Sequence, residues 1–109
     1  MNDRELTELA AKAAGINLEW DGHPDEWQPM YYEGKTYHSF EPLTDDGDAL
    51  RLAVKLQLLM NIGTQATFAN NKVNGETDKW AREQHEDSDP LTATRRAIVR
   101  AAAEIGKAM

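Results

Sequence analysis

The densest group of potential metal ligands is the acidic run from Thr44 to Asp48, which contains Asp45, Asp46 and Asp48. Carboxylate oxygens are ligands that Mg²⁺ and Ca²⁺ prefer, but the ligand spacing of a calcium-binding loop is missing here. Acids at the start of a helix also accept backbone N–H bonds and complement the helix dipole. We therefore interpret the run as a helix start, and we predict neither a metal site nor a cofactor.

The histidines are His23, His38 and His85, and acids lie close in sequence to His23 and His85. Either group could supply part of a metal site or an acid–base pair. No two histidines are close in sequence, and a histidine beside acids is commonly a surface residue. The chain also lacks phosphate-loop, dinucleotide-binding, nucleophile-elbow, zinc-protease and EF-hand motifs. The sequence therefore favours binding over catalysis, and a metal-dependent hydrolase built on the aspartates stays open as the weakest alternative.

Aromatic side chains are concentrated between residues 20 and 40, which hold six of the eight in the chain. Neighbours such as Tyr31 and Tyr32 point to opposite faces of a strand, so one buried face cannot hide the whole group. Exposed Trp and Tyr are typical of binding surfaces, whereas a sheet covered on both sides would bury them. Both interpretations are open. The candidate binding residues are Trp20, Trp27, Tyr31, Tyr32 and Tyr37.

A second candidate patch lies near the C-terminus, at Arg96 and Arg100. These arginines are four positions apart, so they share one face of a helix. They could bind a phosphate or a carboxylate ligand. They could equally pair with acids of this acidic protein, as surface arginines commonly do.

Composition places the chain among ordinary globular proteins. Its 109 residues fit a single domain, residues 1–109. The absence of cysteine excludes disulfides and thiolate chemistry. No apolar run approaches the roughly 20 residues that cross a bilayer, and the N-terminal residues do not resemble a signal peptide. We therefore expect a cytoplasmic protein with no membrane association.

The charge is unevenly distributed along the chain. The formal net charge is −7, and residues 1–43 carry nine acids against three bases, whereas residues 89–109 carry two acids against four bases. The acidic front disfavours direct binding to nucleic acid or to anionic membranes. It could attract a basic surface on another protein, or it could simply keep the protein soluble.

Three segments have helical periodicity. The first helix is predicted over Asp3–Ala14, with Asp3 as its cap and Gly15 after its end. A second begins at Thr44 or Asp45, and its wide apolar face predicts that it is the central core helix. The third begins with Asp89 as cap and Pro90 at its first position, and is predicted to end at Gly106.

Strands are predicted over residues 16–20, 30–32 and 36–40, and within 62–73. Gly34 supplies a tight turn, and Asn74–Gly75 is a strong hairpin signal. Residues 76–85 have no decisive pattern, so strand and helix both stay open there. Short connections favour antiparallel pairing. The sequence therefore predicts an α/β (α+β) fold: a mainly antiparallel sheet of about four to five strands and three helices, packed as an αβα sandwich.

The three predicted helices also carry a family resemblance. The quoted stretches are residues 3–15 (DRELTELAAKAAG), 42–56 (PLTDDGDALRLAVKL) and 93–106 (ATRRAIVRAAAEIG). Together they resemble small proteins of tailed bacteriophages and prophages, the phage ABA-sandwich type. The resemblance implies an α/β sandwich and a phage or prophage origin, hence the cytoplasm of a bacterial host. It implies no activity and no residue roles.

Two functions are compatible with these features. The first is a non-enzymatic phage accessory protein that binds a host component, with inhibition of host defence as one candidate role. We favour a host protein over a small ligand as its partner. The second is a small-ligand protein that binds or sequesters a nucleotide, with aromatics stacking on the base and arginines holding phosphates. Only the second requires the aromatic residues to lie beside Arg96 and Arg100. The sequence leaves the oligomeric state open.

Overall fold

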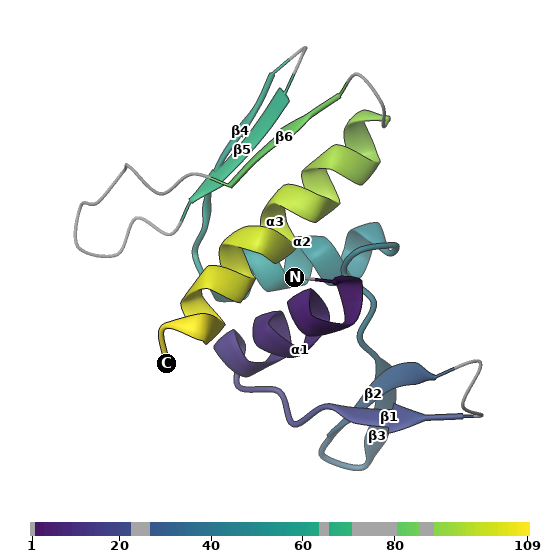
Figure 1. Ribbon diagram of the computed structural model, residues 1–109. Helices are drawn as coiled ribbons and strands as arrows, with labels where there is room; N and C mark the ends of the chain where they lie inside the picture. Colours follow the sequence, from purple (N-terminus) through teal and green to yellow (C-terminus); the bar gives the residue numbers. More distant parts are fainter. Residues whose placement is uncertain (1, 23–26, 64–65, 71–80, 86–88) are drawn as a thin grey trace.

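The computed structural model describes residues 2–22, 27–63, 66–70, 81–85 and 89–109 (Figure 1). The helices are α1 (Asp3–Ala13), α2 (Asp46–Lys55) and α3 (Pro90–Lys107). The strands are β1 (Glu19–Asp21), β2 (Gln28–Glu33), β3 (Thr36–Ser39), β4 (Leu59–Ile62), β5 (Ala66–Asn70) and β6 (Ala81–Gln84). The fold is therefore α+β with antiparallel strand pairs, as the sequence predicts.

The strands form two separate sheets rather than one. β1–β2–β3 and β4–β5–β6 are each three-stranded, and α2 lies between them in the sequence. Figure 1 shows them at opposite ends of the molecule with the helices between. The prediction of a single sheet of about four to five strands in an αβα sandwich is therefore wrong. Short connections identified which neighbours pair, but they carried no information about whether the two strand groups would join.

The central helix is α3, not α2 as the sequence predicted. α3 packs against α1, α2, β5 and β6. Its length lets it reach both the helical partners and the second sheet. On α2, Leu50 and Val54 face outward, so its buried face is narrower than the apolar sequence suggested. Leu59 belongs to β4, most of which lies before the strand predicted within residues 62–73.

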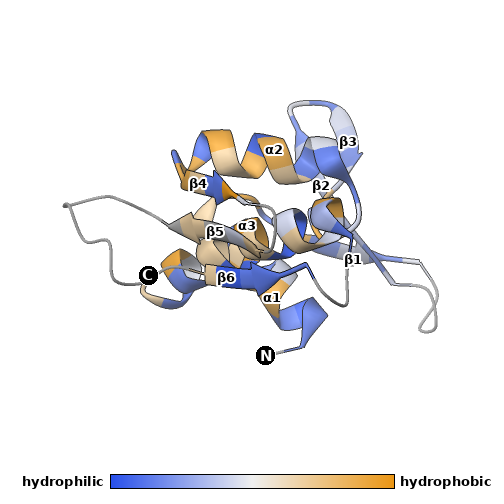
Figure 2. Ribbon diagram, turned by 90° about the horizontal axis from the view of Figure 1, so that it is seen from above, coloured by the Kyte–Doolittle hydropathy of each residue, from blue (hydrophilic) through white to orange (hydrophobic). Residues whose placement is uncertain are grey.

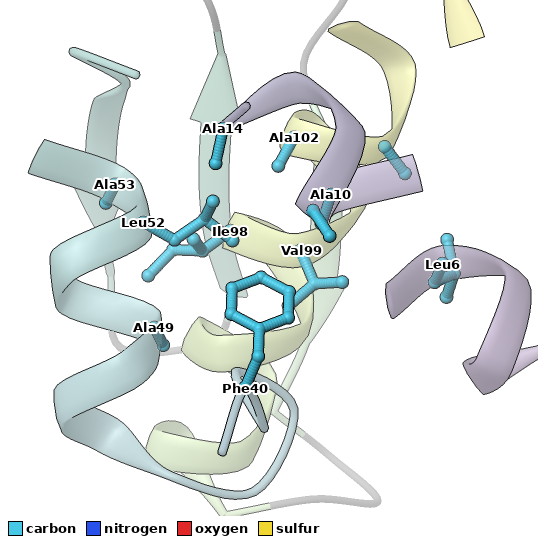
Figure 3. Close-up of a cluster of buried hydrophobic side chains, with 12 residues drawn as sticks. Leu6, Ala10, Ala14, Phe40, Ala49, Leu52, Ala53, Ile98, Val99 and Ala102 are labelled. Atoms are coloured by element: carbon cyan, nitrogen blue, oxygen red, sulfur yellow. The ribbon is translucent and has the colours of Figure 1, made fainter. Parts of the chain in front are cut away.

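Small residues let α1 and α3 approach closely. Ala10, Ala14 and Ala102 lie in the main buried cluster with Val99, as Figure 3 shows. Gly106 is buried, and a methyl group there would overlap the main-chain carbonyl of Leu9 on α1. Gly106 therefore does not end α3, which continues to Lys107, but permits contact between the two helices.

The helix ends follow local capping chemistry. Asn2, rather than Asp3, caps α1, because its side chain accepts the N–H of Glu5. Asp45 caps α2 in the same way. Asp89 caps α3 as predicted, and hydrogen bonds from the side chain and main chain of Thr92 lower the pKa of its carboxyl group.

The remaining sequence predictions have mixed outcomes. Gly15 and Gly34 adopt positive φ, as expected for a helix end and a tight turn. Part of the open segment 76–85 is strand β6, and the predicted Asn74–Gly75 turn lies outside the described residues. Leu91, in the first turn of α3, is exposed. Within the described part of the chain, no helix is long and apolar enough to cross a membrane.

Candidate functional site

The outward face of the β1–β3 sheet carries two tyrosines and two carboxylates. Strand register pairs Tyr32 with Tyr37, and alternation along β1 and β2 places Glu19 and Asp21 on the same face. The two tyrosine rings lie 4.5 Å apart, centroid to centroid. We call Glu19, Asp21, Tyr32 and Tyr37 the aromatic–acidic face. Tyr32 is 62% exposed, so the ring pair is available to another molecule.

A hydrogen bond across the sheet organises this face. The Tyr37 hydroxyl donates to Asp21 Oδ2 at 3.1 Å. Desolvation, the hydrogen bond to Asp21 and the nearby negative charge of Asp21 and Glu19 raise the pKa of Tyr37 to about 12. Tyr37 therefore stays a neutral hydrogen-bond donor at physiological pH. The aromatic–acidic face therefore combines two carboxylates with two neutral rings. None of its four residues is a cation, so the face is acidic.

Trp27 lies directly before β2 and is 43% exposed. The acids Asp25 and Glu26, next to it in sequence, lie outside the described residues. No described hydrogen bond or ring contact holds the Trp27 indole. Its exposure therefore has no evident structural purpose within the described part of the chain.

Trp20 and Tyr31 have a structural role on the inward face of the same sheet. The Trp20 indole Nε1 donates to Glu8 Oε1 at 3.1 Å, and the Arg4 guanidinium lies 4.4 Å from its ring centroid. Both contacts fasten β1 to α1. Tyr31 packs edge-on against buried Phe40, with ring centroids 6.3 Å apart, and contacts the main core. The aromatic group is thus divided: part of it anchors the sheet, and part faces outward.

Arg96 and Arg100 share a face of α3, as their spacing predicts, and both reach Glu83 of β6. Arg100 Nη1 lies 2.8 Å from Glu83 Oε1 and also donates to the carbonyl of Arg82. Arg96 Nη1 donates to Asp3 Oδ1 at 3.1 Å. These contacts favour the interpretation in which both arginines pair with acids of the protein itself. They hold α3, β6 and the start of α1 together.

A pocket of about 390 Å³ lies where β2 faces α2 and the chain after α1. Tyr31 and Tyr32 line it on the sheet side, and Arg51 and Lys55, one turn apart on α2, line it on the helix side. Arg51 and Lys55 are not among the candidate residues predicted from the sequence. Their spacing of four residues does place them on one face of a helix. The same spacing occurs at Arg96 and Arg100, which form internal ion pairs, so it does not by itself identify a ligand site.

The charges in this pocket are largely balanced. Glu33 and Asp48 line it together with Arg51 and Lys55. Asp48 is buried, and its carboxylate accepts the Glu41 N–H at 2.9 Å and contacts Arg51 Nη2 at 2.5 Å. That hydrogen bond raises the pKa of Arg51. Desolvation and the charges of Glu33 and Asp48 raise the pKa of Tyr31, so its hydroxyl remains neutral.

The acidic run before α2 is used in helix capping and ion pairing. Asp45 Oδ2 accepts the Asp48 N–H at 2.8 Å, and Asp46 pairs with Arg95. No three His, Asp or Glu side chains in the described residues gather as metal ligands do. His38 contacts Glu33 at 3.8 Å, and His85 Nε2 lies 2.9 Å from Thr67 Oγ1 in the second sheet. His23 lies outside the described residues.

Comparisons with other proteins give no family for the chain: no family model, no curated protein and no solved structure matches it. The resemblance to phage ABA-sandwich proteins therefore stays a hypothesis. The aromatic–acidic face, Trp27 and the pocket are the features of the molecule that bear on its function.

Proposed function

We propose that the protein is a non-enzymatic binding protein whose partner is another protein with a basic surface, contacted through the aromatic–acidic face and Trp27. The observation that carries the proposal is the exposed Tyr32–Tyr37 ring pair beside the carboxylates of Asp21 and Glu19. Tyrosine faces and carboxylates both attract the guanidinium and ammonium groups of Arg and Lys. Trp and Tyr are also the residues that most often dominate protein–protein affinity.

The overall charge supports a basic partner. A net charge of −7 would steer a basic protein toward this molecule and oppose nucleic acid. The phage resemblance makes a component of a bacterial host the class of partner to test, and inhibition of a host defence protein the role to test within that class. In such a host the protein would act in the cytoplasm.

The experiment compares capture by matched variants. The wild type, Trp27→Ala, Tyr32→Ala and the control Leu91→Ala are immobilised, and partners captured from bacterial lysate are quantified by mass spectrometry. Leu91 is also exposed but lies on α3, away from the first sheet. Truncating an aromatic anchor should weaken binding by about thirtyfold, equivalent to about 2 kcal/mol.

The measured quantity is the recovery of one basic protein by each variant, relative to its recovery by the wild type. Loss with Trp27→Ala and Tyr32→Ala, but not with Leu91→Ala, supports the proposal, provided that circular dichroism shows all variants folded. Capture that weakens as salt rises would agree with charge steering. Equal recovery by all four proteins would show that this face is not the binding site.

Small-ligand binding remains a second candidate, because the pocket brings Tyr31 and Tyr32 together with Arg51 and Lys55. This is the pairing of aromatic rings and cations that nucleotide binding requires, although with different cations from Arg96 and Arg100. Asp48 and Glu33 in the same pocket would repel a polyphosphate, so we rank this function second. Adenosine monophosphate should raise the melting temperature of the wild type but not of Lys55→Ala; no shift in the wild type argues against it.

A further inference from the structure

In the described part of the chain, one edge of the β4–β6 sheet lacks the charged or proline residues that usually prevent further pairing. β4 is the outer strand on one side, and β5 is its only strand neighbour among the described residues. Edge strands commonly carry charged residues or proline, which prevent the addition of another strand. The sequence of β4, Leu59-Met60-Asn61-Ile62, contains neither.

The absence of charge extends beyond the strand. From Leu56 to Asn71 the chain contains no acidic or basic residue, although 28% of all residues are charged. Two of the other outer strands, β1 and β6, each carry charged side chains in their short sequences, EWD and AREQ. In β3 the exposed residues Thr36 and Ser39 are polar, whereas β4 exposes Leu59 and Ile62.

The strand register shows which backbone groups of β4 are free. Gly63 donates its N–H to Ala66, and the register of β4 with β5 places these two residues opposite each other. Hydrogen-bonded positions alternate in an antiparallel pair. The N–H and C=O groups of Asn61 therefore point toward β5, and those of Met60 and Ile62 point toward the open edge.

Exposed apolar side chains occur both on β4 and on α2, the helix that precedes it. Ile62 is 61% exposed, and Leu50 and Val54, one turn apart on α2, are 63% and 68% exposed. Only residues 56–58 separate the end of α2 from β4. Figure 2 shows β4 beside the end of α2, with apolar colour on both elements.

We propose that the occupant of this edge is a second copy of the same chain, joined β4 to β4 in antiparallel orientation. In a two-fold interface residue i meets residue j of the other copy and j meets i, so a patch of one charge sign centred on the axis would face like charge. In a protein of net charge −7, the uncharged apolar edge of β4 can meet its own copy without that local repulsion.

The register defines the pairing. With Asn61 at the two-fold axis, Met60 of one copy lies opposite Ile62 of the other, and the outward N–H and C=O groups of both residues are used. Four backbone hydrogen bonds result, and the two sheets become one sheet of six strands.

The experiment is sedimentation velocity over a range of concentrations with the wild type, Ile62→Pro, Ile62→Lys and the control Leu91→Lys. Proline at position 62 removes an outward N–H and leaves the bonds to β5 intact. Two of the four intermolecular bonds are then lost, which should raise the dimer dissociation constant about thirtyfold. Lysine at position 62 should have a similar or larger effect, whereas Leu91→Lys should not change it.

A concentration-dependent dimer of the wild type that is lost in both position-62 variants supports the proposal. Circular dichroism checks that each variant is folded. If Ile62→Pro is unfolded, the result for Ile62→Lys tests the proposal. A wild type that is monomeric at every concentration overturns the proposal, and so does a dimer that all variants retain. The aromatic–acidic face lies on the other sheet, so failure here would not affect the proposed function.

Discussion

The β1–β3 and β4–β6 sheets have the same number of strands and the same antiparallel order, but they pack differently. The second sheet lies against α3 with small buried residues, including Ala69 and Ala81. The first sheet is fastened by larger side chains, with Phe40 and Tyr31 reaching the core. One face of the first sheet therefore stays exposed, whereas the second sheet exposes the edge formed by β4. The difference shows that packing against a helix, rather than strand pairing, decides which part of each sheet is exposed.

The largest expected effect comes from removing the anchor of the first sheet. Phe40→Ala should cost about 3–5 kcal/mol of unfolding free energy, because a buried ring is replaced by a cavity. Tyr32→Ala, on the outward face of the same sheet, should change stability by no more than about 0.5 kcal/mol. Chemical denaturation measures both. Equal losses would mean that the outward face is as important for folding as the anchor.

Gly106→Ala tests the close approach of α1 and α3, the layer on which both sheets depend. The added methyl group meets the Leu9 carbonyl, a main-chain atom that cannot move alone. Overpacking of this kind typically costs about 1–3 kcal/mol, which exceeds the gain in helix propensity of about 1 kcal/mol. The neighbouring exposed residue provides the control, Lys107→Ala. A higher melting temperature for Gly106→Ala would contradict the packing described here.

Thr67→Val tests the polar contact that fastens the second sheet. The buried Thr67 hydroxyl lies 2.9 Å from His85 Nε2 and 3.0 Å from Thr94 Oγ1. Valine keeps the shape but leaves those partners unsatisfied, so we expect a loss of about 1–3 kcal/mol. Thr36→Val, at an exposed position of the first sheet, should be nearly neutral. Similar melting temperatures for the two variants would remove this distinction between the sheets.

The smallest effect is a pH dependence on the aromatic–acidic face. An unfolded tyrosine ionises near pH 10, whereas the folded Tyr37 keeps its proton until about pH 12. The raised pKa therefore stabilises the fold fully below pH 10, and this contribution is lost between pH 10 and pH 12. Tyr37→Phe should remove it, together with one late step in the tyrosinate absorbance titration. A titration unchanged by the substitution would show that Tyr37 is not the perturbed group.

The sequence by itself determined the local structure of this protein. Helix caps such as Asp45 and Asp89, the turn at Gly34 and the α+β class follow from interactions between residues near in sequence. These features depend on backbone geometry and short-range hydrogen bonds, which a single segment specifies.

Only the tertiary structure decided how the segments are combined. The division of the strands into two sheets, the central place of α3 and the pairing of Arg96 and Arg100 with Glu83 depend on residues far apart in sequence. The aromatic group combines both levels: strand alternation by itself places Tyr31 and Tyr32 on opposite faces, but it does not say which face is covered. Whether such a face is covered depends on which helix packs against it, and the pattern of a single strand carries no information about that partner.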